Sequence, residues 1–139
     1  MAAAFDIVHY GPNMYFVGGE LDMATAPILE TGVEDSLRRG GVILLDMSAV
    51  NFVDSMGIRG IVQLARKLRT GCVVLHGVQE RVSDVFELVR LTDQPNIHVE
   101  ACAADPYPAD EPHAPWTLPE DVGIRLESLR ARYQASGPT

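Results

Sequence analysis

The amino-acid sequence predicts an α/β fold: a mixed, mostly parallel sheet with an N-terminal hairpin and helices packed on it, plus a C-terminal helix. Two observations predict this class. Apolar runs of strand length alternate with segments whose apolar residues recur at helical spacing, a pattern typical of parallel strands joined by right-handed helical crossovers. Near the N-terminus, the turn sequence Gly11-Pro12-Asn13 separates two strand-like runs, as in an antiparallel hairpin.

The composition is that of a small globular protein. Of its 139 residues, 47% are hydrophobic and 22% are charged, which suits one core. The formal net charge of −8 is spread along the chain and argues against nucleic acid as a partner. We recognise neither a signal peptide nor a stretch long enough to span a membrane. We therefore expect a cytoplasmic protein without direct membrane insertion.

The first half of the chain predicts a hairpin, a helix and a central strand. Residues 5–9 and 14–17 are rich in aromatic and β-branched side chains and form the hairpin. Thr25-Ala26-Pro27 has a capping hydroxyl and an early proline, so a helix should begin there. Its apolar stripe runs to Leu37, and Gly40-Gly41 should end it. The continuous apolar run 42–45 predicts a strand covered on both faces.

The second half continues the alternation. We expect residues 46–54 to form a loop that leads into a helix beginning at Ser55. A strand over 72–75, a helix with apolar positions between Val82 and Val89, and a last strand over 96–101 follow.

Three segments make up the expected domain organisation. Residues 1–103 form the α/β domain, and residues 104–116 form a proline-rich acidic linker. Residues 117–135 begin with a capping-box sequence and carry an apolar stripe, so they predict an amphipathic helix. This helix could pack on its own domain or dock on a partner, and its role stays open.

The segment with the most functional information surrounds Ser55. It leaves a parallel strand and opens a helix, and ligand or partner sites gather at that edge of a parallel sheet. A serine at a helix N-terminus is also commonly a simple cap, and Asp54 competes for the same capping role. Position alone therefore leaves the function of Ser55 open.

Two short sequences resemble the bacterial STAS domains that act as anti-sigma factor antagonists. Asp54-Ser55-Met56-Gly57-Ile58 is similar to the family's phosphorylation motif Asp-Ser-Ser-Gly-Leu, with Met56 in place of the second serine. Gly19-Glu20-Leu21-Asp22, followed by Thr25-Ala26-Pro27, matches a second family sequence. The resemblance covers residues 5–101. It implies a STAS-like fold, with Ser55 as the residue that a partner kinase phosphorylates.

The resemblance also implies the partner-binding residues. Asp22 corresponds to an aspartate near the phosphorylated serine at the kinase-binding surface, and the binding set comprises Asp22, Thr25, Asp54, Ser55, Met56 and Gly57. One departure is Arg90, where the family usually has a glycine at the end of the third helix. Because arginine adopts the left-handed conformation less readily than glycine, we expect this helix end to differ locally.

The function implied is a partner switch. The unphosphorylated protein would bind an anti-sigma factor that is also a serine kinase, in transcription regulation of the stress-response type, and phosphorylation of Ser55 would release it. The added charge of about −1.5 to −2 beside Asp54 and Asp22 should weaken docking without unfolding the helix end. We expect a monomer or weak dimer. STAS domains also serve as subunits of membrane lipid transporters or as signalling scaffolds, so that alternative stays open.

The sequence predicts no catalytic residues, metal site or cofactor. The serine lacks the elbow sequence of hydrolases, the histidines show no metal-ligand spacing, and no phosphate-binding loop is present. The protein is therefore expected not to be an enzyme. Cys72 and Cys102 lie at opposite ends of neighbouring parallel strands, about 15 Å apart, which is too far for an undistorted disulfide. We expect free thiols, and a redox role for them stays open.

Overall fold

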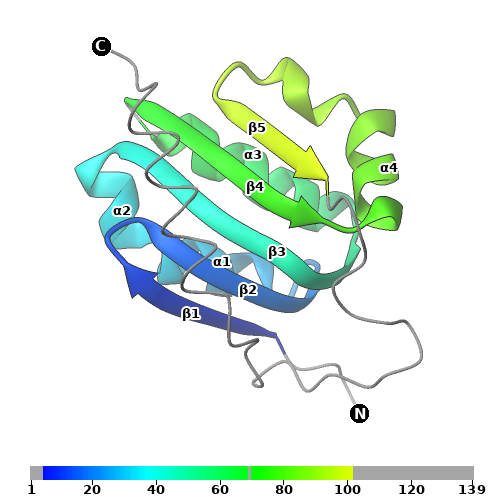
Figure 1. The fold of residues 1–139 in the computed structure, drawn as a ribbon, viewed down its shortest axis with the longest axis horizontal. Coiled ribbons are helices and arrows are strands. Elements are labelled where there is room, and N and C mark those ends of the chain that lie inside the picture. The colour runs from blue at the N-terminus through cyan, green and yellow to red at the C-terminus, as the bar shows by residue number, and fades with distance from the viewer. Residues whose placement is uncertain (1–4, 69, 102–139) are drawn as a thin grey trace.

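The computed structural model describes residues 5–68 and 70–101, which form a five-stranded sheet with helices packed on it (Figure 1). The strands lie in their order along the chain. The predicted α/β class is therefore confirmed, whereas the predicted linker 104–116 and helix 117–135 lie outside the described residues. The elements are β1 (Asp6–Gly11), β2 (Met14–Leu21), α1 (Ala26–Gly32), α2 (Glu34–Arg39), β3 (Gly41–Val53), α3 (Ser55–Lys67), β4 (Gly71–Val78), α4 (Glu80–Leu88), the 3-10 turn η1 (Leu91–Asp93) and β5 (Ile97–Ala101).

The hairpin and the parallel sheet were both predicted. β1 pairs antiparallel with β2, and Asn13 adopts a positive φ of 63° in the turn between them. Across this pair the rings of His9 and Tyr15 stack with centroids 4.7 Å apart. The pairs β2–β3, β3–β4 and β4–β5 are all parallel, so β3 is the central strand.

β3 is much longer than predicted. The sequence indicated a loop over residues 46–54, but the strand continues to Val53 and pairs with β2 as far as Leu21. Register shifts beside Gly18 and Glu20 let the two strands stay paired despite their irregular spacing. The prediction was wrong because Asp46 and Ser48 interrupt the apolar pattern, although both are buried. In this strand the Asp46 carboxylate accepts hydrogen bonds from the amide and the hydroxyl of Ser48.

The single helix predicted between residues 25 and 40 is two short helices. α1 ends at Gly32 and α2 begins at Glu34, with Val33 at φ −106° and ψ 8° between them. The side chain of Val33 is fully buried at this break. Glycine and a β-branched residue are both weak helix formers, so the break falls where helix propensity is low and burial of Val33 can decide the backbone path.

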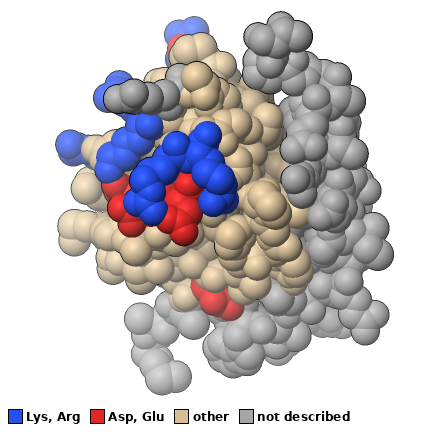
Figure 2. Space-filling view, turned by 90° about the vertical axis from the view of Figure 1, so that its left-hand side faces the viewer, with Lys and Arg blue, Asp and Glu red and all other residues tan. Residues whose placement is uncertain are grey.

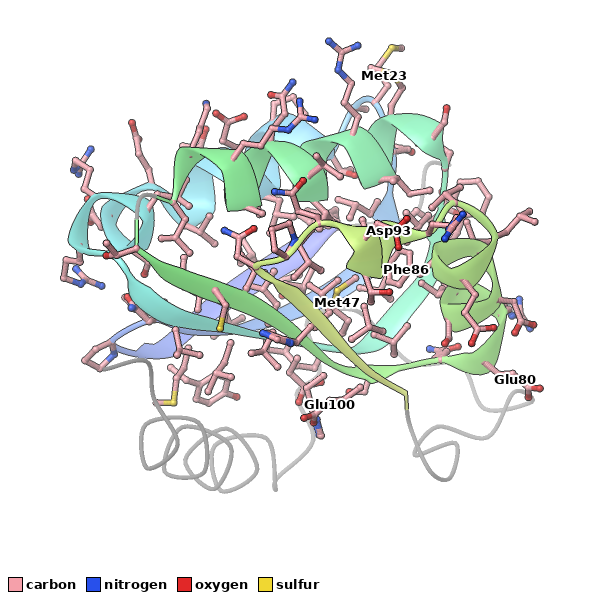
Figure 3. The ribbon with its side chains drawn as sticks, turned by 90° about the horizontal axis from the view of Figure 1, so that it is seen from above. Met23, Met47, Glu80, Phe86, Asp93 and Glu100 are labelled. Carbon is pink, nitrogen blue, oxygen red and sulfur yellow. The ribbon has the colours of Figure 1, made fainter. Side chains whose placement is uncertain are left out.

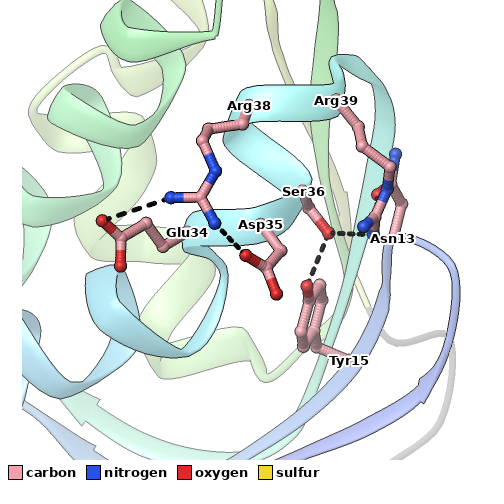
Figure 4. A network of polar contacts seen from close by, with 7 residues as sticks. All are labelled: Asn13, Tyr15, Glu34, Asp35, Ser36, Arg38 and Arg39. Carbon is pink, nitrogen blue, oxygen red and sulfur yellow. Dashed lines mark hydrogen bonds and ion pairs between the residues drawn. The ribbon is translucent and has the colours of Figure 1, made fainter.

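A buried hydroxyl pair fastens α2 to the sheet (Figure 4). The side-chain oxygens of Tyr15 on β2 and Ser36 on α2 lie 2.5 Å apart, and both residues are buried. Arg39 donates to Ser36 and to Asn13, while the Asn13 amide group donates to the carbonyl of Gly40. These contacts give each buried hydroxyl a partner, which avoids the cost of an unsatisfied polar group.

All the described helices pack on one face of the sheet, which we call the first face. Leu29 on α1, Ile61 on α3 and Phe86 on α4 share one core cluster with side chains of β2, β3 and β4. Figure 3 shows Phe86 between the sheet and the helices. The strand order explains the arrangement, because successive right-handed crossovers that advance in one direction put every crossover helix on the same side.

The end of α4 corrects a further expectation. Arg90 adopts the left-handed conformation, with φ 58° and ψ 47°, immediately before η1. The helix therefore ends as it would with a glycine at this position. The next residue, Leu91, is buried, and its burial supplies a reason for the chain to accept the conformational cost at Arg90.

Candidate functional site

The candidate site lies where β2 and β3 end side by side. Their last paired residues are Leu21 and Val53, so Asp22 and Asp54 leave the sheet at the same edge. The amide of Asp54 donates to the carbonyl of Leu21 at 3.2 Å, which ties the entrance of α3 to the end of β2. Two sequence motifs that are separated along the chain are therefore brought together by strand pairing.

Asp54, rather than Ser55, caps α3. The Asp54 side chain accepts a hydrogen bond from the amide of Gly57 at 2.9 Å, which is the usual geometry of an N-cap residue. Ser55 is the first residue of the helix and is exposed. The capping alternative for Ser55 is thus resolved, since Asp54 has that role and leaves the Ser55 hydroxyl accessible.

Gly57 allows α3 to approach β2 closely. A Cβ atom at this position would lie 2.3 Å from the carbonyl oxygen of Leu21, which is far inside a normal contact. One turn later, a Cβ at Gly60 would lie 3.0 Å from the Cβ of Ala26 on α1. The two glycines therefore position the entrance of α3 against β2 and α1. Gly57 is buried, so its role in this structure is to permit that packing.

Asp22 and Thr25 stabilise the turn between β2 and α1. A carboxylate oxygen of Asp22 accepts from the amides of Ala24 and Thr25, at 2.9 and 3.0 Å. The Thr25 hydroxyl accepts from the Asp22 amide and donates to the carbonyl of Glu20 at 2.7 Å. Both side chains thus hold the turn, and Asp22 stays partly exposed beside the α3 entrance.

Three exposed apolar residues lie in the segments that carry Asp22 and Ser55. Met23, Phe52 and Met56 are 69%, 47% and 39% exposed, and we call these three residues the apolar rim. Met23 projects away from the body of the molecule in Figure 3. The sequence analysis had selected Met56 but missed Met23 and Phe52. A large apolar residue within the turn between Asp22 and Thr25 was the available signal for Met23, because turn positions are ordinarily polar.

The electrostatic setting combines a helix N-terminus with two carboxyl groups. The amides of Ser55 and Met56 have no hydrogen-bond partner among the residues that the structure describes. These two amides lie at the N-terminus of α3, where the helix dipole is positive. This end of the helix therefore favours an anion. Asp54 and Asp22 bring negative charge to the same edge of the sheet. The arrangement can present a hydroxyl group to an enzyme and can accommodate a phosphate on it.

Among the described residues, His76 does not form a serine hydrolase arrangement with Ser55. His76 lies on β4 with Nδ1 2.8 Å from a carboxylate oxygen of Glu100 on β5. Both residues point to the sheet face opposite the helices, whereas Ser55 opens α3 on the first face. The imidazole is therefore directed away from the serine.

A groove lies at the other end of α3. It encloses about 970 Å³ between α1, α2 and the end of α3, and it includes Glu30, Glu34, Arg38 and Lys67 in its lining. Charged side chains at this groove form ion pairs with one another. Lys67 pairs with Glu30, and Arg38 pairs with both Glu34 and Asp35. Figure 2 shows Lys and Arg side chains gathered around Asp and Glu on this side of the molecule. The groove therefore lies at the C-terminal end of α3, whereas Ser55 lies at the N-terminal end.

Other functional classes receive little support from the described residues. Within residues 5–68 and 70–101, no three His, Cys, Asp or Glu side chains gather so as to hold a metal ion. None of the helices in this part of the chain combines the length and hydropathy needed to cross a membrane. Cys72 is a free thiol whose pKa is raised by burial. Cys102 lies outside the described residues, so its distance from Cys72 stays a prediction.

The model of the STAS domain family matches residues 5–101. The chain belongs to the STAS domain family. This confirms the resemblance that the motifs around Asp22 and Ser55 predicted, and it agrees with the mostly parallel sheet and its hairpin.

One relative in sequence and two proteins of similar fold resemble this STAS domain. The anti-sigma-B factor antagonist of Listeria monocytogenes is 33% identical over 81 residues, which cover 56% of this chain and 71% of the relative. The Bacillus cell fate determinant SpoIIAA in its phosphorylated form superposes with a TM-score of 0.50 and 18% identity, over 69% of this chain and 90% of that one. A sulfate transporter family protein of Wolinella succinogenes has a TM-score of 0.55 and 14% identity, over 86% and 87%. At these identities the two structures show a shared fold alone.

Proposed function

We propose that this STAS domain is an anti-sigma factor antagonist without enzymatic activity of its own. In the proposed cycle it binds an anti-sigma factor with serine kinase activity while Ser55 is unphosphorylated, and phosphorylation of Ser55 releases it. The observation that carries the proposal is the exposed hydroxyl of Ser55 at the first position of α3, beside exposed apolar side chains.

The relatives support this role. The Listeria relative is an anti-sigma-B factor antagonist and is 33% identical to this chain over 81 residues. SpoIIAA, which has a similar fold, exists in a phosphorylated form. The likeness to the sulfate transporter family protein is one of fold, and no feature of the Ser55 site favours the alternative of a transporter subunit or scaffold.

The physical basis of release is a change from apolar contact to charge repulsion. A docked partner would cover the apolar rim and remove water from the edge that carries Asp22 and Asp54. A phosphate on Ser55 adds about −1.5 to −2 charge there, and desolvating it beside two carboxylates is costly. The fold should tolerate the phosphate because the unpartnered amides of Ser55 and Met56 can bind its oxygens.

A first experiment measures binding of the anti-sigma factor by calorimetry. Ser55→Ala should bind as tightly as the wild type, whereas Ser55→Asp should bind at least tenfold more weakly, a loss of about 1.4 kcal/mol. Thr92→Asp serves as a matched control because Thr92 is exposed on η1, an element that contributes no residue to the Ser55 site. Equal affinities of Ser55→Asp and Thr92→Asp would contradict the proposal.

A second experiment tests the phosphorylation itself. Incubation with the anti-sigma factor and ATP should add one phosphate to the wild type, located at Ser55 by mass spectrometry, and none to Ser55→Ala. Transfer to another residue would remove Ser55 from the mechanism. Co-purification of the native protein with a transporter ATPase, in place of a serine kinase, would instead support the subunit alternative.

A further inference from the structure

The face of the sheet opposite the helices, the second face, is buried although none of the described helices lies on it. Four side chains form a cluster there, and each is at most 2% exposed: Met14, Phe16, Leu44 and Val74. Figure 3 shows Glu100 on this side of the sheet, away from the described helices. Parallel strands with apolar side chains on both faces are ordinarily covered on both. Some further part of the protein is therefore needed over the second face.

We propose that the C-terminal segment 117–135 docks on the second face as an amphipathic helix and completes a second core. The topology of the described residues provides no other cover, since the right-handed crossovers put α1, α2, α3 and α4 on the first face. The chain continues beyond β5 with residues 102–139, so the cover can come from the protein itself.

The linker is long enough for this docking. β5 is an edge strand beside β4, and the four apolar residues lie on β2, β3 and β4. Strands are spaced about 4.8 Å apart, so the sheet is about 20 Å wide from β5 to β1. An extended linker over residues 104–116 reaches about 40 Å, and a helix over 117–135 is about 28 Å long. The helix can therefore lie across the centre of the second face.

The apolar pattern of the segment matches this face. Its stripe of Val122, Leu126, Leu129 and Tyr133 occupies one side of a helix with 3.6 residues per turn. The second face offers a cluster of similar size, with further partly buried apolar side chains around it, including Val8, Tyr10 and Cys72. An apolar stripe of this kind is unfavourable in water, and the second face gives it a complementary surface.

The charges are complementary as well. Asp46 and Glu100 are carboxylates of the second face. Asp46 on β3 pairs with His76 on β4 in the strand register, and His76 pairs with Glu100 on β5, so the three residues lie in one row across the sheet. Both take part in further interactions, so neither is an isolated charge. On the segment, Arg125 and Arg130 lie about 70° to either side of the apolar stripe at the helical angle of about 100° per residue. Docking of the stripe therefore brings cations toward the carboxylates at the margin of the cluster.

The test uses Cys72 as a reporter in the full chain. In a Cys102→Ser background, Cys72 is the one remaining thiol, and it packs at the margin of the second face. We expect Leu129→Glu to raise the alkylation rate of Cys72 by iodoacetamide several-fold, because the charged residue would release the segment. Ala131→Glu is the matched control, since residue 131 is on the opposite side of the helix from the stripe and gains the same charge. Equal rates for the two variants would overturn the proposal.

A second measurement covers the case in which Leu129→Glu unfolds the protein. Single cysteines placed on the stripe, at 122, 126 or 129 in turn, should include at least one that forms a disulfide with Cys72 in a monomer, whereas Ala131→Cys should not. Light scattering measures whether the disulfide-linked species is a monomer or a dimer. A dimer cross-linked between two chains would mean that a second copy covers the second face, and it would refute docking of the segment. Neither readout involves the anti-sigma factor, so these results are independent of the proposed function.

Discussion

At Gly57 the backbone of α3 comes so close to Leu21 that a side chain has no room. The obstacle is a backbone carbonyl oxygen, 2.3 Å from the position of a Cβ, so a small rotamer change cannot relieve the clash. Gly32 differs, because a Cβ there would meet the end of the Ile7 side chain at 3.0 Å, which is free to shift. Close packing of the backbone therefore requires glycine at position 57, whereas position 32 can accept a small side chain.

We predict that Gly57→Ala destabilises the protein by about 1–3 kcal/mol, the usual range for a forced overpacking. Gly32→Ala should change the free energy of unfolding by less than about 1 kcal/mol, because the gain in helix propensity offsets a small shift of Ile7. Urea denaturation of both variants measures the difference. Similar midpoints would show that α3 can move away from β2 at little cost.

Asp54 stabilises α3 as its N-cap. Asp54→Ala removes the acceptor of the Gly57 amide and should cost about 1 kcal/mol. Asp54→Asn keeps a capping oxygen and should lose only a few tenths of that. Thermal denaturation followed by circular dichroism distinguishes the two, and an equal loss in both would mean that the negative charge, rather than the cap, is what stabilises α3.

At the scale of elements, the end of α4 combines a left-handed Arg90 with an exposed ion pair between Arg90 and Asp93. The left-handed conformation costs an arginine about 1–2 kcal/mol, while an exposed ion pair contributes at most about 1 kcal/mol. We therefore predict that Arg90→Gly stabilises the protein by up to about 1 kcal/mol. Arg81→Gly, in the first turn of α4, is the control and should destabilise by up to about 1 kcal/mol. A rise in the urea midpoint for Arg90→Gly alone verifies the prediction.

Elements whose limits depend on local chemistry could be predicted from the sequence. The start of α3 follows from Asp54 and the apolar positions after it, and the hairpin turn follows from its proline and asparagine. The length of β3 could not be predicted, since Asp46 and Ser48 are acceptable in a strand only once each has the other as a partner. Likewise, the apolar rim depends on which side chains remain uncovered after folding, which periodicity does not report.

At the scale of the whole molecule, the sheet separates two apolar clusters. Phe86 belongs to the cluster under the helices and Phe16 to the second face, and both are at most 2% exposed. We predict that Phe16→Ala costs as much as Phe86→Ala, about 3–5 kcal/mol each. Phe52→Ala, at the exposed rim, should cost less than about 1 kcal/mol. A small loss for Phe16→Ala in urea denaturation would show that the second face contributes little to stability.

The tie between Leu21 and the entrance of α3 has a consequence for how such proteins diversify. The backbone contacts there fix where the serine sits, yet they involve none of the side chains of Met23, Phe52 or Met56. Those three residues can therefore be exchanged over generations without moving the hydroxyl. Under the proposed function, duplicated copies of such a gene can acquire separate partners while every copy keeps the same serine in the same place.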